Sequence, residues 1–199
     1  MIADCTAIIL AGGDSRRMGS DKANLLLDGQ TLLQRAIATM QQVFPYVIIS
    51  VRQPRPDVDL PQVCDEQTGE GMPGTGPLAG LVAGLRSVKT PWAFAVACDM
   101  PFVEPALVEW LGKFRSTRQA VVPVVQGHPQ PLAAFYAGSC VAAMRESLST
   151  QDKSLRRALQ MLDVCYVDQA GMLEADPELR SFFDLDTPQD VEKALRGVK

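Results

Sequence analysis

A glycine-rich, basic segment follows the first apolar run of the chain. It spans Leu10 to Lys22, and its three glycines, Gly12, Gly13 and Gly19, would let backbone N–H groups approach phosphate oxygens. Lysine and arginine side chains offset phosphate charge, and the segment supplies them at Arg16, Arg17 and Lys22. The Gly-Lys-Ser/Thr ending of a Walker A loop is missing, and with it the usual magnesium-binding hydroxyl. The segment therefore predicts a triphosphate loop whose metal ligand lies elsewhere; a solvated basic turn is the alternative.

A single carboxylate, Asp99, follows a later apolar run at Trp92–Ala97. A hard cation such as Mg²⁺ prefers carboxylate oxygens, and an aspartate at the end of a buried strand would lie close to bound phosphates. We therefore predict that Asp99 is a magnesium ligand. The alternative is that it caps a helix beginning near Glu104.

The segment Asp184-Leu185-Asp186-Thr187-Pro188 carries two more carboxylates. Thr187 and Pro188 are typical of the N-cap and first residue of a helix. Because alternate residues of an extended segment project the same way, Asp184 and Asp186 should share a face. We predict that Asp186 is a second magnesium ligand beside Asp99.

The elements that must position these residues alternate between apolar strand-like runs and helix-like periods. This alternation predicts an α/β fold of three layers, Rossmann-like, with a mostly parallel central sheet and a single domain spanning residues 1–199. In such sheets, ligands bind beyond the carboxyl ends of the strands. The predicted strands are Thr6–Ala11, Tyr46–Val51, Trp92–Ala97, Ala120–Val125, Leu132–Tyr136 and Val164–Val167; the predicted helices are Thr31–Val43, Pro77–Val88, Glu104–Phe114, Ser139–Leu148, Ser154–Leu162 and Pro188–Leu195.

Composition narrows the class of protein. The 199 residues carry a formal net charge of -4, which argues against a nucleic-acid partner. Apolar runs fall short of the roughly 20 residues that span a bilayer, and no signal-peptide pattern is present, so we expect a cytoplasmic protein without a membrane partner. The five cysteines are scattered without a C-x-x-C pair and are predicted to be reduced structural thiols.

The opening segment resembles the signature of the molybdenum cofactor guanylyltransferases, or MobA-like proteins: L-A-G-G-x-S-x-R-M-G-x-D-K. Cys98 to Phe102 is similar to their C-D-x-P-F magnesium site, Gly76 to Gly80 to their G-P-L-x-G segment, and Pro131 to Tyr136 to their P-L-x-A-x-Y strand. The resemblance covers essentially the whole chain. It implies a site for GTP formed by Leu10, Ala11, Gly12, Gly13, Ser15, Lys22, Asp65, Gly76, Gly80 and Asp99, with Arg17, Lys22 and Asp99 as catalytic residues.

The resemblance also implies a reaction: GMP is transferred from GTP to the terminal phosphate of molybdopterin, with Mg²⁺ as cofactor and molybdoenzymes or their chaperones as transient partners. The L-A-G-G form is associated with GTP use and L-A-A-G with CTP use. A molybdopterin cytidylyltransferase, a nucleotidyltransferase for a sugar or lipid phosphate, and a non-catalytic cofactor chaperone are the alternatives.

The acceptor side is less well marked in the sequence. Where MobA-like proteins commonly carry N-x-N-T-P, this chain carries Asp-Leu-Asp-Thr-Pro, a difference that bears on acceptor recognition. A basic cluster at a helix start, Lys153, Arg156 and Arg157, could hold an acceptor phosphate or simply face solvent. The acceptor-binding residues that we predict are Pro131, Arg156, Asp184 and Asp186.

Overall fold

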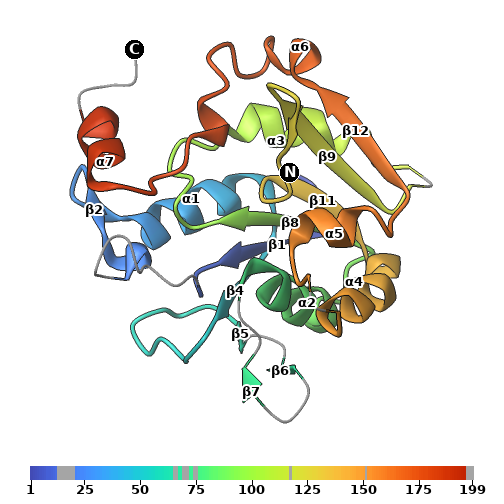
Figure 1. Cartoon of the computed structure of the whole chain (residues 1–199). Coiled ribbons are helices and arrows are strands. Elements are labelled where there is room, and N and C mark those ends of the chain that lie inside the picture. Colours follow the sequence, from blue (N-terminus) through green and yellow to red (C-terminus); the bar gives the residue numbers. More distant parts are fainter. Residues whose placement is uncertain are drawn as a thin grey trace.

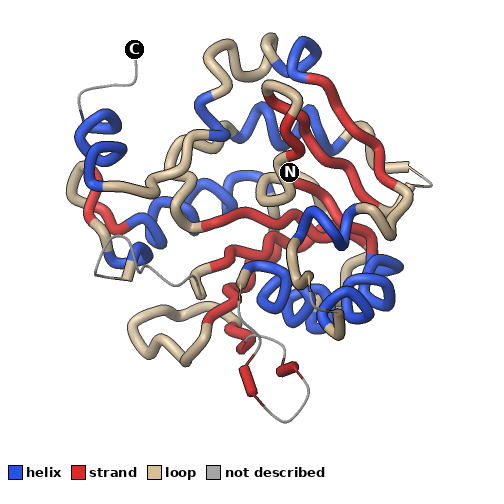
Figure 2. Tube along the Cα trace, viewed as in Figure 1, coloured by secondary structure: helices blue, strands red, loops and turns tan. Residues whose placement is uncertain are grey.

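A computed structural model describes residues 1–12, 21–64, 67–68, 72–73, 76–116, 118–150 and 152–195. Its centre is a large sheet that crosses the molecule between helices (Figures 1 and 2). The strands of this sheet are β1 (Cys5–Leu10), β4 (Tyr46–Val51), β5 (Gln62–Cys64), β8 (Trp92–Ala97), β9 (Ala120–Val125), β10 (His128–Pro129), β11 (Ala134–Ala137) and β12 (Val164–Asp168).

The strand order is β5-β4-β1-β8-β11-β9, and both β10 and β12 also pair with β9. The pairs β1–β4, β1–β8, β4–β5 and β9–β12 are parallel, while β11 runs antiparallel to β8 and β9, and β10 antiparallel to β9. Within the described residues, the predicted mostly parallel α/β sheet is therefore confirmed, with an antiparallel insertion near one edge.

Helices cover both faces of the sheet because its central strands are apolar on both sides. In β1, Ile9 packs with α1 (Leu32–Val43) and α3 (Pro105–Gly112) on one face, whereas Ile8 packs with α2 (Pro77–Ser87) and α4 (Val141–Leu148) on the other. Figure 1 shows α2 and α4 below β1 and β8, and α3 above these two strands. The helices are α1 (Leu32–Val43), α2 (Pro77–Ser87), α3 (Pro105–Gly112), α4 (Val141–Leu148), α5 (Leu155–Leu159), α6 (Gln169–Met172) and α7 (Pro188–Leu195).

Short elements connect this framework. The 3-10 turn η1 (Lys22–Asn24) leads into the hairpin of β2 (Leu26–Leu27) and β3 (Gln30–Thr31), and a second small hairpin joins β6 (Gln67–Thr68) to β7 (Met72–Pro73). Two further 3-10 turns are η3 (Gly138–Cys140) and η4 (Arg180–Phe182). A small separate core of Leu27, Leu32, Leu185 and Ala194 packs the β2–β3 hairpin against the C-terminal part of the described chain.

Most predicted boundaries agree with the structure within one or two residues. The largest difference is the end of α5 at Leu159 instead of Leu162. The start of β11 at Ala134 instead of Leu132 is one of three boundaries that differ by two residues, with the start of α4 and the end of α3. Pro131 cannot donate a sheet hydrogen bond, and Ala133 has a φ of 125°, so regular pairing begins only after it. None of the helices in the described ranges is both long and apolar enough to cross a bilayer.

Candidate active site

A cavity of about 360 Å³ opens at the carboxyl ends of β1, β4 and β8. Its volume lies within the range of about 300–1,000 Å³ that is usual for small-molecule sites. Seven parts of the chain line it: the ends of β1, β4 and β8, the turn η1, the start of α2, and two later loops. The lining residues are Leu10, Ala11, Gly12, Asp21, Lys22, Ala23, Ser50, Gly76, Pro77, Gly80, Ala97, Cys98, Asp99, Met100, Gln130, Pro131, Leu132 and Asp184.

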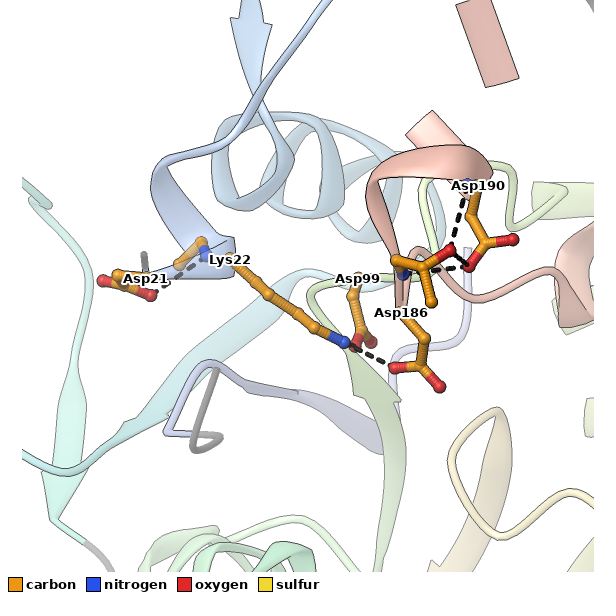
Figure 3. A network of polar contacts seen from close by, with 7 residues as sticks. Asp21, Lys22, Asp99, Asp186 and Asp190 are labelled. Carbon is orange, nitrogen blue, oxygen red and sulfur yellow. Dashed lines mark hydrogen bonds and ion pairs between the residues drawn. The ribbon is translucent and has the colours of Figure 1, made fainter. Parts of the chain in front are cut away.

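The ammonium group of Lys22 lies between two carboxylates (Figure 3). Its Nζ donates to Asp99 Oδ2 at 2.8 Å and to Asp186 Oδ1 at 2.6 Å. Burial opposes the charge on Lys22, but the hydrogen bonds to Asp186 and Asp99 and their negative charges outweigh it, so its pKa lies above the ordinary value. Lys22 therefore stays cationic at neutral pH.

Each member of this group sits on a different element. Lys22 is the first residue of η1, and the side chain of Asp21 caps that turn by accepting from Ala23 N at 3.0 Å. Asp99 follows β8, and its carbonyl oxygen accepts from Leu185 N at 3.0 Å, which joins it to the segment that carries Asp186. The site thus depends on packing between segments far apart in the sequence.

A C-terminal strap, residues 176–187, brings Asp184 and Asp186 to the cavity. The buried carboxylate of Asp176 accepts from the backbone N–H groups of Arg180 and Ser181 at 3.1 and 2.9 Å. The hydroxyl of Ser181 in turn accepts from Glu104 N at 2.9 Å, at the start of α3. These bonds fix the strap to the body of the protein before it reaches the site.

The other end of the strap is held by the start of α7. Thr187 N donates to Asp190 Oδ2 at 2.9 Å and Asp190 N donates to Thr187 Oγ1 at 3.3 Å, a reciprocal capping pair. This geometry agrees with the predicted N-cap role of Thr187. The predicted alternative for Asp99, capping of α3, does not occur, since Glu104 is the N-cap of that helix.

Asp184 lines the cavity beside the ion-pair group. Loss of hydration, together with the negative charges of Asp99 and Asp186, raises the pKa of its carboxyl to about 7, even though the residue as a whole is exposed. The nearby charge of Lys22 acts in the opposite direction. Three carboxylates near one ammonium leave an excess of negative charge, which a divalent cation would offset.

The start of α2 also lines the cavity. Gly76 is the N-cap, with a φ of 94° that favours glycine, and Pro77 occupies the first turn. Among the described residues, no side-chain hydrogen bond caps this helix end. The first N–H groups of a helix have no acceptor within the helix, so together with the helix dipole they favour an anionic or polar ligand group here.

Two carboxylates lie close enough together to hold one Mg²⁺ ion, but the described residues alone do not supply a complete set of ligands. Oxygens of Asp99 and Asp186 converge on a single cationic atom, Lys22 Nζ, so one cation can contact both. Across the described ranges, no three His, Cys, Asp or Glu side chains form a metal cluster. Mg²⁺ is commonly held by one or two carboxylates together with substrate phosphates and waters, which fits this arrangement.

The structure brings most of the predicted site residues together. The predicted residues that line the cavity are Leu10, Ala11, Gly12, Lys22, Gly76, Gly80, Asp99, Pro131 and Asp184, and Asp186 joins them through Lys22. Gly13, Ser15, Arg17 and Asp65 lie outside the described residues. Arg156 is exposed on α5 and does not line the cavity.

Sequence reasoning missed two polar residues of the wall, Ser50 and Gln130. Ser50 is a buried polar residue near the end of an otherwise apolar strand, and this isolated polarity was the signal available. Gln130 precedes Pro131, whose carbonyl oxygen accepts from Tyr136 Oη at 2.7 Å. That hydrogen bond from a buried tyrosine fixes this side of the wall.

The protein combines a mostly parallel α/β sheet with a cavity at the carboxyl edge of that sheet, and a cation, carboxylates and a helix start surround the cavity. This combination is typical of the class of proteins that bind phosphorylated ligands. Comparison with known proteins makes this specific. The chain belongs to the MobA-like NTP transferase domain family, which matches residues 7–167. The resemblance inferred from the sequence motifs is thereby confirmed.

Relatives of similar length support this assignment. A protein of Chloroflexus aggregans named "Probable molybdenum cofactor guanylyltransferase" is 37% identical over 94% of this chain and 91% of its own. A molybdenum cofactor guanylyltransferase of Desulfosudis oleivorans is 31% identical over 98% and 96% of the two chains. The crystal structure of molybdopterin-guanine dinucleotide biosynthesis protein A from Archaeoglobus fulgidus has a TM-score of 0.84 at 26% identity, covering 96% of this chain and 97% of its own.

Proposed function

We propose that this protein transfers GMP from GTP to the terminal phosphate of molybdopterin and releases pyrophosphate. The observation that carries the proposal is the Lys22 ammonium, held by Asp99 and Asp186 at a cavity that the start of α2 also lines. Guanine and molybdopterin are favoured by the names of the relatives and by the L-A-G-G form of the opening segment.

On the nucleotide side, the end of β1 and the start of α2 would hold the triphosphate and base. Lys22 would offset charge on the phosphates as the bond from the α-phosphorus to the departing pyrophosphate breaks. Gly13, Ser15, Arg17 and Asp65, which the resemblance also assigns to GTP or catalysis, stay predictions. Other predicted contributors to this side are Leu10, Ala11, Gly12, Gly76 and Gly80.

Asp99 and Asp186 would hold Mg²⁺, which when bound neutralises phosphate charge and orients the α-phosphorus for in-line attack. A phosphate of the acceptor is already ionised at neutral pH, so an oxygen of that phosphate can attack without a general base. The contribution of the chain is then positioning and electrostatic stabilisation.

On the acceptor side, Gln130–Leu132 and Asp184 line the cavity and are proposed to face the pterin substrate. Arg156 stays a predicted acceptor contact only if the acceptor extends beyond the cavity to α5. We further propose that residues 1–199 form a single domain and that the protein is cytoplasmic. Molybdoenzymes or their chaperones would receive the finished cofactor.

The test is pyrophosphate release from GTP, measured with and without molybdopterin in the presence of magnesium. We expect release to require both substrates. Asp99→Asn should lower kcat by about 10²-fold or more, because it removes one charged ligand and one partner of Lys22 with little change of shape. It should also weaken the magnesium dependence of GTP affinity measured by calorimetry.

Asp163→Asn is the matched control, since Asp163 pairs with Arg118 at the surface and away from the cavity. It should leave both quantities unchanged. Tight CTP binding with negligible GTP binding would contradict the choice of guanine. If the protein binds nucleotide but releases no pyrophosphate with any acceptor tested, including sugar and lipid phosphates, the result would instead favour a cofactor chaperone.

A further inference from the structure

Arg55 contacts the turn η1 from a loop that does not line the cavity. It lies between β4 and β5, and its side chain is only 13% exposed. Its Nη1 donates to Asp21 Oδ2 at 2.7 Å, and its Nη2 donates to Asn24 Oδ1. Two nitrogen atoms of one planar guanidinium thus contact two residues of the turn that carries Lys22.

Those two residues are the ends of η1. Asp21 is its N-cap, Asn24 is its last residue, and Lys22 lies between them. Backbone bonds from Asn24 N to Asp21 O and from Leu25 N to Lys22 O, both 3.0 Å, close the turn. A three-residue turn has little stability of its own, so side-chain contacts at both ends restrict it strongly.

Arg55 is itself fixed by β5. The side chain of Gln62 accepts from Arg55 N at 2.8 Å and donates to Arg55 O at 2.7 Å, satisfying both backbone groups of the residue. Gln62 Nε2 also donates to Val58 O at 3.1 Å, which closes the loop on itself. A continuous set of bonds therefore runs from the sheet through Gln62 and Arg55 to η1.

The charge of Arg55 has a second effect on the cavity. Asp21 lines the cavity, and its carboxylate would repel a bound triphosphate. The Arg55 guanidinium offsets that charge at 2.7 Å. Lysine in the same place could keep the charge, but it could not contact Asp21 and Asn24 with a rigid planar fork.

We propose that Arg55 is a positioning residue for the proposed transfer reaction: it holds η1 at both ends, and so sets where the Lys22 ammonium lies relative to Asp99 and Asp186. The inference rests on the proposed function for its kinetic consequence. Its structural consequence concerns the substrate-free protein and is independent of the reaction.

The first experiment is amide hydrogen exchange in the full chain without substrates. In Arg55→Lys, exchange at Ala23 and Asn24 should be faster by about tenfold or more, because lysine cannot hold both ends of the turn at once. Arg35→Lys is the matched control: Arg35 is also mostly covered, and its hydrogen bonds go to Leu27 O and Asp28 rather than to residues of η1. Unchanged exchange at η1 in Arg55→Lys would overturn the inference, whatever the activity.

The second experiment is kinetic. Arg55→Lys should lower kcat by about 10- to 100-fold with KM for GTP changed less than about threefold, since misplacing a catalytic cation affects the transition state most. Arg55→Gln should in addition raise KM for GTP, and adding Asp21→Asn should restore that KM without restoring kcat. Arg35→Lys should match the parent chain in both constants.

A double-variant cycle separates positioning from general destabilisation. If Arg55 acts through Lys22, Arg55→Lys should cause no further loss of kcat in a Lys22→Met background. Independent, additive losses would overturn the inference, with circular dichroism establishing that each variant is folded. A parent chain that releases no pyrophosphate would refute the proposed function, and hydrogen exchange would then decide the role of Arg55.

Discussion

Replacement of Asp176 by asparagine tests whether the C-terminal strap positions the site. Asp176 is 3% exposed, and each of its carboxylate oxygens accepts one backbone N–H, from Arg180 and from Ser181. Asparagine has nearly the same shape but only one acceptor oxygen. Its amide group would face one of the two N–H donors, which leaves a buried donor without a partner.

The expected cost is about 1–3 kcal/mol in the free energy of unfolding, the usual range for an unsatisfied buried group. Native stabilities of about 5–15 kcal/mol leave such a variant folded. At about 2–4 °C per kcal/mol for a chain of this size, Tm should fall by about 2–12 °C. Because the strap carries Asp186, we also expect kcat to fall by about tenfold, through misplacement of a contact of Lys22.

The assays are urea unfolding and pyrophosphate release on the same preparations. Asp168→Asn is the control: Asp168 accepts from Ala170 N at 2.9 Å at the exposed start of α6, where asparagine caps equally well, so both quantities should be unchanged. An Asp176→Asn chain that loses stability but keeps its full kcat would refute a positioning role of the strap. Unchanged stability would refute the hydrogen-bond argument itself.

Two further outcomes follow from packing and burial. Gly84→Ala should lower the free energy of unfolding by about 1–2 kcal/mol in urea titrations, because the new methyl group would lie 2.7 Å from Cγ2 of the stiff, buried Ile8. Gly138→Ala is the control: its methyl group would meet only a backbone oxygen at 3.8 Å, so the free energy of unfolding should change little. In alkylation at pH 8 followed by mass spectrometry, exposed Cys64 should react well before Cys98, since burial and the nearby Asp99 raise the pKa of the Cys98 thiol to about 12; equal rates would contradict that burial.

The sheet was predictable because its strands are short, apolar and bounded by turn residues. Tyr46–Val51, Trp92–Ala97 and Ala120–Val125 have the predicted bounds. Where the prediction and the structure differ, tertiary context decides: the Pro131–Ala133 stretch could not be recognised as a bend because its apolar pattern continues into β11. The family was predictable because one long motif follows the first strand.

The completed site was only partly predictable. Lys22 and Asp99 follow strands that pair directly, so their meeting follows from the fold class. The further contact of Lys22 with Asp186 depends on the strap, whose course is set by single hydrogen bonds that no periodicity encodes. Arg55 lies in a loop between two prolines and belongs to no recognisable motif. Arg156 has the charge expected of a phosphate-binding residue, but it does not line the cavity.

The span of the Lys22–Asp186 contact has a consequence for synthesis of the protein. The two residues are 164 positions apart, and Asp186 leaves the ribosome long after η1 and β8. At about 5–20 residues per second, Lys22 waits roughly 10–30 s for Asp186. A nascent chain can thus build its sheet early, yet the complete charge arrangement forms only in a chain translated through the strap, which makes activity a reporter of finished folding.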